Sequence, residues 1–382
     1  MRRPTSILLV TRNFPPLVGG MENVNDRLLR ELSERWGVAL CGPVGSRKHA
    51  PLATKVVESA LNPIGLFLVA TFFRAAWVSL RLRPRIVLAG SGLTLPIAWF
   101  AAKLVGARLG VYLHGLDIIA PSRIYQMFWP RFIRYCDLIM VNSSSTASLA
   151  IGKVVDPRRI EVLHPGTSIP VLDSDSRARF RALIDAGSEP ILLSVGRLTK
   201  RKGLAEFVAQ ALPAILVAFP GTRLIIVGEE AVDALTGTGE SERDRIIAAA
   251  TASDTGHALK FVGRLTESEL GDAYQAADIH VFPVLKMVGD VEGFGMVALE
   301  SAAHGLRTVA FEVGGIPDAV QVPATGALVP SGDYRKFADV VISVLQTGPG
   351  SISGCRDFAK AKSWEVFGTR VRALVSTEMG DV

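Results

Sequence analysis

Short apolar runs rich in valine, isoleucine and leucine recur along the whole chain, and this repetition most constrains its fold. In the first half they occupy residues 6–11, 37–43, 85–91, 108–115, 138–143 and 159–166. A second series occupies residues 190–197, 223–230, 259–265, 278–284, 307–315 and 326–333. The runs are nearly continuous, so each strand is expected to be buried on both faces, as in a parallel sheet covered by helices. The chain is therefore predicted to form two doubly wound α/β domains.

Length and charge also favour two domains. The chain has 382 residues, against about 100–200 per domain. Residues 1–170 carry 21 Lys and Arg against 9 Asp and Glu, a net +12, whereas residues 171–382 carry 21 against 27, a net −6. A basic half suits anionic lipid, nucleic acid or a phosphate-bearing substrate. The halves are thus expected to have different partners.

The domain boundaries follow from the same pattern. We expect an N-terminal domain over residues 1–170, a C-terminal domain over residues 171–360, and a last helix over residues 361–382 that packs back toward the N-terminal domain. Residues 165–188 are predicted to be a linker with a lead-in helix. Helical spacing of apolar residues spans residues 357–378.

Several classes of protein are excluded. The three cysteines, Cys41, Cys136 and Cys355, have no C-x-x-C spacing, which excludes a disulfide scaffold and the usual cysteine zinc sites. The apolar run at residues 7–10 is too short for a signal peptide. Neither uncharged stretch, 59–73 or the Gly- and Pro-interrupted 86–102, provides the roughly 20 residues of a membrane-spanning helix. A soluble or membrane-surface protein is predicted.

The most informative loop is Glu292-Gly293-Phe294-Gly295, which leads into a helix beginning near Met296. In open α/β sheets ligands bind beyond the carboxyl ends of the strands, and free backbone N–H groups there suit a phosphate or sugar oxygen. Glu292 and Glu300 can accept hydrogen bonds from the hydroxyls of a sugar and a ribose. The alternative is a capping glutamate and a solvated helix glutamate.

A second loop, at residues 194–203, concentrates positive charge. Arg197, Lys200, Arg201 and Lys202 lie between a buried strand and a helix that starts near Leu204. Guanidinium and ammonium groups beside a helix N-terminus suit a diphosphate. A solvated basic loop is the alternative.

The first half offers weaker signals. Gly19 and Gly20 follow the first strand and open a helix, as in a glycine-rich anion loop, although a plain tight turn has the same sequence. His114 and Asp117 follow the strand at residues 108–113. A lone histidine is more often structural, and this is the alternative; the position of His114 at a strand end and the nearby Asp117 favour a functional role.

Two motifs are discounted. Gly90-Ser91-Gly92 resembles a dinucleotide fingerprint but has Leu95 where a glycine or alanine is required, so a nicotinamide enzyme is not expected. Asp173-Ser174-Asp175 has the D-x-D form of metal-dependent sugar transferases. It lies in the predicted linker without a strand before it, so no metal site is predicted.

Taken together, these segments resemble the retaining glycosyltransferases of family 4. The resemblance covers nearly the whole chain and is most specific in VGRLTKRKG followed by EGFGMVALE. It implies the GT-B fold, which has two facing Rossmann-like domains with an active-site cleft between them. VGEE at residues 227–230 departs from the more usual VGDGP-like segment.

The resemblance also implies roles for the matching residues. Arg197 and Lys202 would hold the diphosphate of the donor, and Glu300 its ribose hydroxyls. Glu292, with the backbone of Gly293, Phe294, Gly295 and Met296, would hold the transferred sugar. Val262 and its neighbours would line the base pocket. Gly19 and Gly20 would approach the diphosphate, His114 would lie near the reacting sugar, and Asp117 is a candidate contact for the acceptor or the sugar.

The implied reaction transfers a sugar from a nucleoside-diphosphate sugar with retention of configuration, without an obligatory metal or cofactor. Arg197 and Lys202 would stabilise the charge that develops on the leaving diphosphate. Because no carboxylate emerges as a nucleophile, a front-face reaction is preferred to a covalent intermediate. The acceptor is expected to be a saccharide or a lipid-linked saccharide of the cell envelope.

Two stretches suggest a membrane surface. Residues 64–83 and 128–132 mix aromatic residues with arginines, a combination typical of interfacial helices; a buried core helix with snorkelling arginines is the alternative. We expect a cytoplasmic protein that can bind the inner face of the cytoplasmic membrane. An epimerase or phosphorylase of the same fold and a nucleic-acid binder are the competing classes. The acidic second half argues against nucleic acid.

Overall fold

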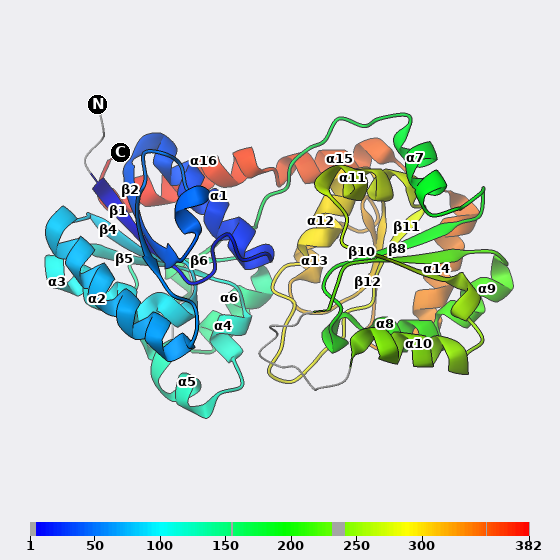
Figure 1. Cartoon of the computed structure of the whole chain (residues 1–382), viewed down its shortest axis with the longest axis horizontal. Helices are drawn as coiled ribbons and strands as arrows, with labels where there is room; N and C mark the ends of the chain where they lie inside the picture. Colours follow the sequence, from blue (N-terminus) through cyan, green and yellow to red (C-terminus); the bar gives the residue numbers. More distant parts are fainter. Residues whose placement is uncertain (1–4, 154–155, 231–240, 349, 382) are drawn as a thin grey trace. The chain divides into compact units, whose positions relative to one another are not determined.

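The computed structural model describes residues 5–153, 156–230, 241–348 and 350–381. It contains two compact units, one formed by Met1–Gly166 with Trp364–Val382 and the other by Thr167–Ser363. Each unit holds one sheet in which every pair of neighbouring strands is parallel (Figure 1). The α/β prediction with two Rossmann-like units is therefore confirmed.

The sheet of the first unit has the order β3-β2-β1-β4-β5-β6-β7. Its strands are β1 (Thr5–Val10), β2 (Gly37–Pro43), β3 (Lys55–Ser59), β4 (Ile86–Ala89), β5 (Arg108–Leu113), β6 (Leu138–Val141) and β7 (Ile160–Val162). The strand β3 was not predicted from the sequence. Its sequence KVVES carries Lys55 and Glu58 because an edge strand need not be apolar throughout.

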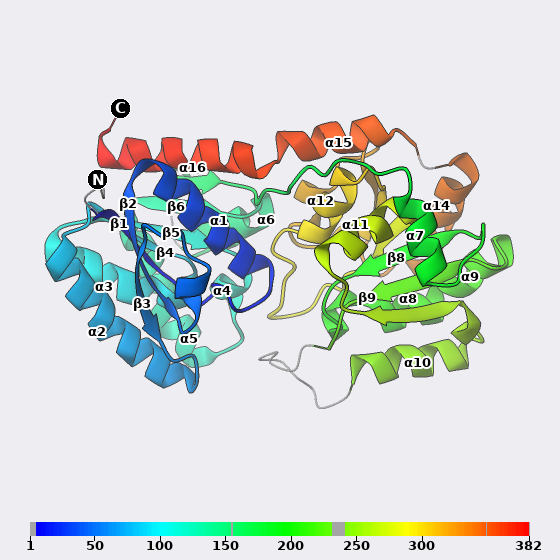
Figure 2. The same ribbon diagram turned by 45° about the horizontal axis from the view of Figure 1, so that its top comes forward.

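Helices cover both faces of this sheet. In both views α2 (Ile64–Leu82) and α3 (Leu95–Val105) lie side by side on one face, and α1 (Gly20–Arg35) and α16 (Trp364–Met379) on the other (Figures 1 and 2). Shorter helices follow β5 and β6: α4 (Leu116–Ile119), α5 (Arg123–Phe128) and α6 (Ser144–Ile151). The order of strands diverges between β1 and β4, so the loops after these two strands flank the point where α/β sheets bind ligands.

The helix α2 is longer than the uncharged stretch suggested. It has 19 residues and, by length and composition alone, could cross a membrane, which corrects the expectation that no segment reaches that length. A helix that covers a sheet passes the same test, and α2 packs on β1, β2, β3 and α3. Phe67, Ala75 and Val78 form its buried face. These contacts make α2 part of the first unit's architecture.

The sheet of the second unit has the order β10-β9-β8-β11-β12-β13. Its strands are β8 (Ile191–Val195), β9 (Arg223–Val227), β10 (Leu259–Gly263), β11 (Ile279–Phe282), β12 (Thr308–Phe311) and β13 (Gly326–Val329). Its helices are α7 (Ser176–Leu183), α8 (Leu204–Gln210), α9 (Leu212–Ala218), α10 (Glu242–Ala252), α11 (Glu267–Ala276), α12 (Met296–Ala303), α13 (Ile316–Ala319), α14 (Tyr334–Thr347) and α15 (Ile352–Ala361). Here the order diverges between β8 and β11.

The helix predicted over residues 357–378 is in fact two helices, α15 and α16. The break lies at Lys362 and Ser363, where the backbone pairs with Thr167: Thr167 N donates to Lys362 O at 3.1 Å. A backbone engaged in this bridge cannot continue the helical hydrogen bonds. Beyond it α16 buries Phe367, Val371 and Val375 within the first unit.

Candidate functional site

The turn after β8 packs closely against the loop after β11. Gly203, at φ 68°, closes the short helix η5 (Lys200–Lys202), and a Cβ there would lie 2.1 Å from the carbonyl oxygen of Pro283. Only glycine allows both this conformation and this approach. Leu285 N donates to Arg201 O at 2.8 Å. The basic turn and the glutamate loop, far apart in sequence, are thereby brought into contact.

This contact forms a compact cluster of charges. Lys202 Nζ lies 2.8 Å from Glu292 Oε2, and Arg201 binds the same oxygen through its guanidinium. Arg201 Nε also lies 3.2 Å from Asp290 Oδ2. Lys202 Nζ sits 4.7 Å above the centre of the Phe282 ring, a cation–π contact. Lys202 and Glu292, both predicted to hold the donor, thus meet directly, and Arg201 joins them.

Burial and charge act against each other in this cluster. Burial raises the pKa of Glu292, but Lys202 and Arg201 outweigh it and lower that pKa to about 2. Burial lowers the pKa of Lys202, and the contact with Glu292 opposes this. Glu292 is therefore an anion at neutral pH, held between two cations.

Arg197 differs from its neighbours. Its side chain is exposed and makes no hydrogen bond or ion pair with the described residues. It follows Gly196 directly beyond the end of β8, beside the strand pair β8–β11 where the sheet order diverges. Arg197 is thus available to an anionic ligand, as is the exposed Lys200 farther along the turn.

Glu300 lies on α12 beneath this cluster and is held by a tyrosine. Tyr274 Oη, on α11, donates to Glu300 Oε2 at 3.2 Å. The Tyr274 ring is buried and stacks on His304, with ring centres 4.9 Å apart. Burial raises the pKa of Glu300, and the hydrogen bond from Tyr274 opposes this. One carboxylate oxygen is thus fixed by the protein, which leaves Oε1 for a ligand.

The loop from Gly293 to Met296 forms the N-terminus of α12. Gly295, at φ 94°, is its N-cap and provides no side-chain cap, so the first N–H groups of the helix are not satisfied by a side chain. Phe294 is buried in the core and anchors the loop. A Cβ at Gly315 would lie 2.1 Å from Gly293 O, which shows how closely the next loop packs. This geometry suits an oxygen ligand.

Val262 lies on β10, at the edge of the second sheet and two strands from β8. It is half-buried and packs on the cluster that includes Val195 and Val227. The neighbouring backbone is fixed, because Gly228 N donates to Gly263 O at 2.8 Å. The segment VGEE, which differs from the more usual VGDGP-like sequence, is therefore hydrogen-bonded to the end of β10, near Val262.

In the first unit, the carbonyl oxygen of Gly90 connects three loops. His114 Nε2 lies 3.0 Å from Gly90 O and must carry the proton, since a carbonyl only accepts. Asn25 Nδ2, on α1, also donates to Gly90 O, at 3.1 Å, and to Asn13 O at 2.9 Å. His114 is buried, and its ring is fixed at the end of β5 by this bond. The loops after β1, β4 and β5 are thus tied together.

Asp117 reinforces the same edge of the sheet. Its Oδ1 accepts from His114 N at 2.9 Å, and its Oδ2 accepts from Gly92 N at 2.8 Å. Both carboxylate oxygens therefore bind backbone amides. Asp117 therefore positions the loop that carries His114.

Gly19 and Gly20 begin α1 at the end of the loop after β1. The loop is held by Asn13, whose Nδ2 donates to Glu22 Oε1 at 2.8 Å. Gly19 is the N-cap and provides no side-chain acceptor. The two glycines are thus placed at a helix N-terminus, as expected for an anion loop.

The discounted aspartates serve the local fold. Asp173 Oδ1 accepts from Asp175 N at 3.0 Å, and its Oδ2 lies 2.7 Å from Arg179. Within the part of the chain that the structure describes, no group of three or more His, Cys, Asp or Glu could hold a metal ion.

The sequence analysis assigned no role to Tyr274, Asn25 or Asp290, and it treated Arg201 as one member of a basic run. Arg201 carried a signal, because it lies beside Lys202. Tyr274 and Asn25 carried none. Each contacts its partner only because helices α11 and α1 pack beside the strand ends.

Comparison with known families agrees with this geometry. The model described as Glycosyltransferase Family 4 matches residues 18–169, and the model described as Glycosyl transferases group 1 matches residues 175–362. Together they cover both units. The chain belongs to the family 4 glycosyltransferases.

Similar proteins extend the comparison. The transferase is 27% identical, over 97% of its length and 98% of the relative's, to the GDP-mannose-dependent monoacylated alpha-(1-6)-phosphatidylinositol monomannoside mannosyltransferase of Corynebacterium glutamicum. It is 29% identical to D-inositol 3-phosphate glycosyltransferase of Mycolicibacterium smegmatis, over 64% of its own chain and 54% of that protein, so it spans about half of that relative.

Solved structures share the fold. Anabaena HepE in complex with UDP has a TM-score of 0.81 at 17% identity, covering 98% of this chain and 100% of that one. Sucrose-phosphate synthase from Thermosynechococcus elongatus has a TM-score of 0.80 at 20% identity, covering 99% and 100%. The transferase therefore has the GT-B fold.

The Glu292 cluster predicts a specific acid response. Its folded pKa of about 2 lies below the ordinary 4.5, so the stability it contributes is present above pH 4.5 and is lost as pH falls toward 2. We expect Glu292→Gln to lower the free energy of unfolding at pH 7 by about 3 kcal/mol, since two largely buried cations, 15% and 17% exposed, lose their partner. Between pH 4.5 and 2 the variant should lose less stability than the wild type. Urea unfolding at a series of pH values measures both effects.

Glu312→Gln is the matched control, because Glu312 is an exposed carboxylate of the same unit. Its acid profile should follow that of the wild type. If the profile of Glu292→Gln also followed the wild type throughout, the ion cluster would not exist in solution.

Proposed function

We propose that the chain is a retaining glycosyltransferase that moves a sugar from a nucleoside-diphosphate sugar to a hydroxyl of a saccharide or lipid-linked acceptor. The observation that carries this proposal is the cluster of Arg201, Lys202 and Glu292 before the N-terminus of α12, with the unpaired Arg197 on the same turn as the two cations. Cations and free N–H groups beyond the carboxyl ends of neighbouring strands suit a diphosphate leaving group. The product would belong to a cell-envelope polysaccharide or glycolipid.

The residues divide the work as follows. Arg197 and Lys202 bind the diphosphate, and Glu300 Oε1 accepts from the ribose hydroxyls while Tyr274 holds Oε2. Glu292 and the backbone of Gly293 to Met296 bind the transferred sugar. The side chain of Val262 and the neighbouring backbone line the pocket for the nucleotide base.

The chemical step breaks the bond between the anomeric carbon and the diphosphate oxygen and forms one to the acceptor oxygen on the same face. The leaving phosphate oxygen takes the proton of the acceptor hydroxyl, and the cations stabilise the charge that remains. Positive side chains suffice for this role, so no metal is required. Gly19 and Gly20 offer N–H groups to the diphosphate, and His114 offers its ring to the sugar.

Relatives support the class of donor and acceptor. The name of the corynebacterial relative includes a nucleotide sugar, GDP-mannose, and a mannoside of phosphatidylinositol. Anabaena HepE was solved in complex with UDP. A panel of nucleotide sugars that includes GDP-mannose and UDP-glucose, with lipid-linked acceptors, is therefore the appropriate assay.

The exposed face of α2 supports the proposal of a membrane-surface location. Leu66, Val69, Phe73, Trp77 and Leu80 recur at helical spacing and are 53–66% exposed. An apolar stripe of this kind on a monomer marks an interaction surface, and lipid matches the arginines beside it. We place the enzyme peripherally on the inner face of the cytoplasmic membrane.

Removal of Arg197 tests the transfer reaction. We expect the wild type to gain thermal stability from one nucleoside diphosphate, with or without a chelator, and to form a product with the donor's anomeric configuration. Arg197→Ala deletes one or two charge-assisted hydrogen bonds of about 1.5–3 kcal/mol each, so turnover should fall tenfold or more. Melting curves and product analysis by NMR measure these effects.

Lys200→Gln removes a charge from the same turn as Arg197 and is the control; its turnover should stay within about twofold of wild type, far from the tenfold loss. Activity of Arg197→Ala within the same range would contradict the diphosphate role. Conversion of the donor without any acceptor would indicate an epimerase instead.

Glu300→Gln tests the ribose contact. A neutral amide weakens two charge-assisted hydrogen bonds, so affinity for the matching ribonucleoside diphosphate should fall about tenfold. Tyr274→Phe loses only the bond that orients Glu300, about 1 kcal/mol, and should cost about fivefold. Isothermal titration measures both. A 2′,3′-dideoxy analogue should bind the wild type and both variants equally; an equal loss for this analogue would show general damage to the site.

Val69→Ser combined with Phe73→Ser tests the membrane surface. Each apolar side chain contributes about 1.5–3 kcal/mol when buried in lipid, so binding to vesicles should fall at least tenfold. Sedimentation with anionic vesicles at low salt measures it. Val217→Ser, on an exposed position of α9 in the second unit, is the control and should bind as the wild type does. Unchanged binding of the double variant would refute this surface.

A further inference from the structure

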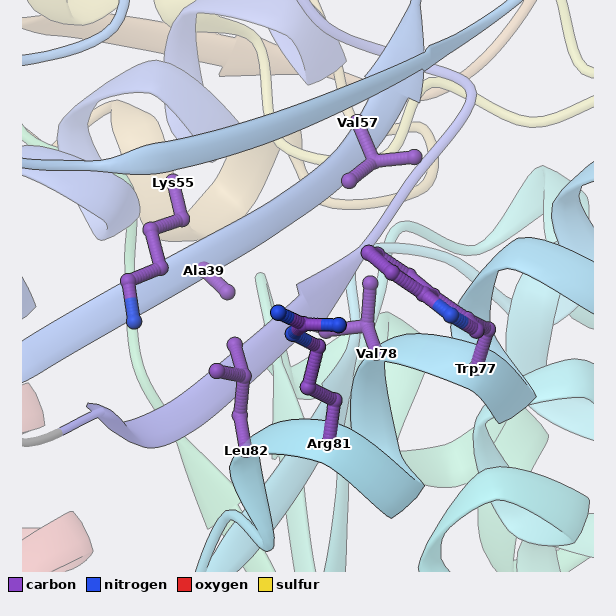
Figure 3. Close-up of a pocket in the computed structure, with 7 residues that line it drawn as sticks. All are labelled: Ala39, Lys55, Val57, Trp77, Val78, Arg81 and Leu82. Atoms are coloured by element: carbon purple, nitrogen blue, oxygen red, sulfur yellow. The ribbon is translucent and has the colours of Figure 1, made fainter.

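A small hollow lies between the last turns of α2 and the strands β2 and β3 (Figure 3). Its volume is about 250 Å³, and its lining residues are Ala39, Lys55, Val57, Trp77, Val78, Arg81 and Leu82. Pockets for drug-sized ligands measure about 300–1,000 Å³. This hollow therefore suits a smaller group, about the size of a phosphate headgroup.

The hollow is separate from the candidate site in the first unit. Lys55 is the first residue of β3 and pairs in register with Ala39 of β2, so the hollow opens toward the amino ends of these strands. Gly19 and His114 lie beyond the carboxyl ends of β1 and β5. Because neighbouring strands are parallel, the hollow and the candidate site lie at opposite ends of the strands of one sheet.

Two cations border the hollow, and neither is neutralised. Lys55 and Arg81 are exposed and form no ion pair with the described residues. Figure 3 shows them approaching from β3 and from α2, with the Trp77 ring to one side. The Arg81 guanidinium lies 5.5 Å from the centre of that ring. A site of this kind selects an anion that also has apolar parts.

The surrounding surface has the same sign. No Asp or Glu occurs between Glu58 and Asp117, whereas this stretch holds six Lys and Arg residues. The helices α2 and α3 fall entirely within it. An anion at the hollow thus meets no nearby carboxylate on either helix.

Trp77 connects the hollow with the membrane surface. It lines the hollow and is also one of the exposed residues of the apolar stripe on α2. Tryptophan at this kind of boundary lies at the level of lipid headgroups. A lipid whose acyl chains contact the stripe would have its phosphate beside Trp77, within reach of Lys55 and Arg81.

We propose that this hollow binds the phosphate headgroup of an anionic glycerophospholipid, and so adds a specific lipid contact to the apolar stripe of α2. The proposal rests on the membrane association proposed above. Arg81 and Lys55 bind the phosphate oxygens, and Val57, Val78 and Leu82 contact the glycerol and the first methylenes. The bound lipid is a membrane ligand of the first unit, distinct from donor and acceptor.

The test compares Lys55→Gln combined with Arg81→Gln against Arg335→Gln combined with Lys336→Gln. Both pairs remove two exposed cations, the second pair from α14 of the other unit. At about 1 kcal/mol per cation, the first pair should weaken sedimentation with phosphatidylglycerol vesicles about 30-fold. The control pair should stay within about twofold of wild type, because its cations lie outside the contact. Binding to vesicles of pure phosphatidylcholine should be equal for all three proteins.

A titration with monomeric dihexanoyl phosphatidylglycerol tests the hollow without a bilayer. The wild type should bind it saturably with a change in Trp fluorescence that Trp77→Phe abolishes, and the Lys55 and Arg81 variant should not bind. Absence of saturable binding by the wild type overturns the proposal. Equal affinity for inorganic phosphate also overturns it, because the hollow would then take a free anion.

Failure of this proposal is distinguishable from failure of the proposed function. Vesicle binding that is lost in the Val69 and Phe73 variant but unchanged in the Lys55 and Arg81 variant refutes the hollow alone. None of the residues proposed to bind the nucleoside diphosphate lines the hollow, so absence of stabilisation by a nucleoside diphosphate would refute the transferase and leave the lipid result standing.

Discussion

The largely buried contact of Glu292 with Lys202 and Arg201 is the interaction on which the candidate site depends. Burying three charges is costly unless each is paired, and here one carboxylate oxygen serves two cations while Asp290 provides a second acceptor for Arg201. The absence of a Cβ at Gly203 lets the two loops approach closely enough for this pairing. The cations are thus positioned before any ligand arrives, which is the preorganisation that electrostatic catalysis needs.

The first unit holds its loops with hydrogen bonds to the backbone instead of ion pairs. Gly90 O accepts from His114 and Asn25, and Asp117 accepts from the backbone of the loops after β4 and β5. An ion cluster in one unit and a hydrogen-bond network in the other therefore hold loops at the carboxyl ends of the strands. On the outer side of the first unit, α2 combines a buried face with an exposed apolar stripe and the cationic hollow at its C-terminal end. One helix accordingly has both a structural and a proposed lipid-binding role.

The placement of part of the candidate site could be predicted because parallel sheets impose simple rules. Continuous apolar runs predicted the strands, and the loops beyond their carboxyl ends contained Arg197, Lys202 and Glu292. The edge strand β3 escaped prediction because Lys55 and Glu58 interrupt its apolar run. The break between α15 and α16 escaped it because apolar spacing continues on both sides of a bridge made by distant Thr167.

By itself, the sequence determined the alternation of strands and helices, because burial on both faces of a strand demands local apolar composition. Only the tertiary structure decided which side chains meet. Lys202 and Glu292 are separated by 90 residues and come together because β8 and β11 are neighbours in the sheet, an order that no local pattern encodes. Tyr274 reaches Glu300 for the same reason, since the contact depends on how α11 and α12 pack beside the strands and not on either helix's own sequence.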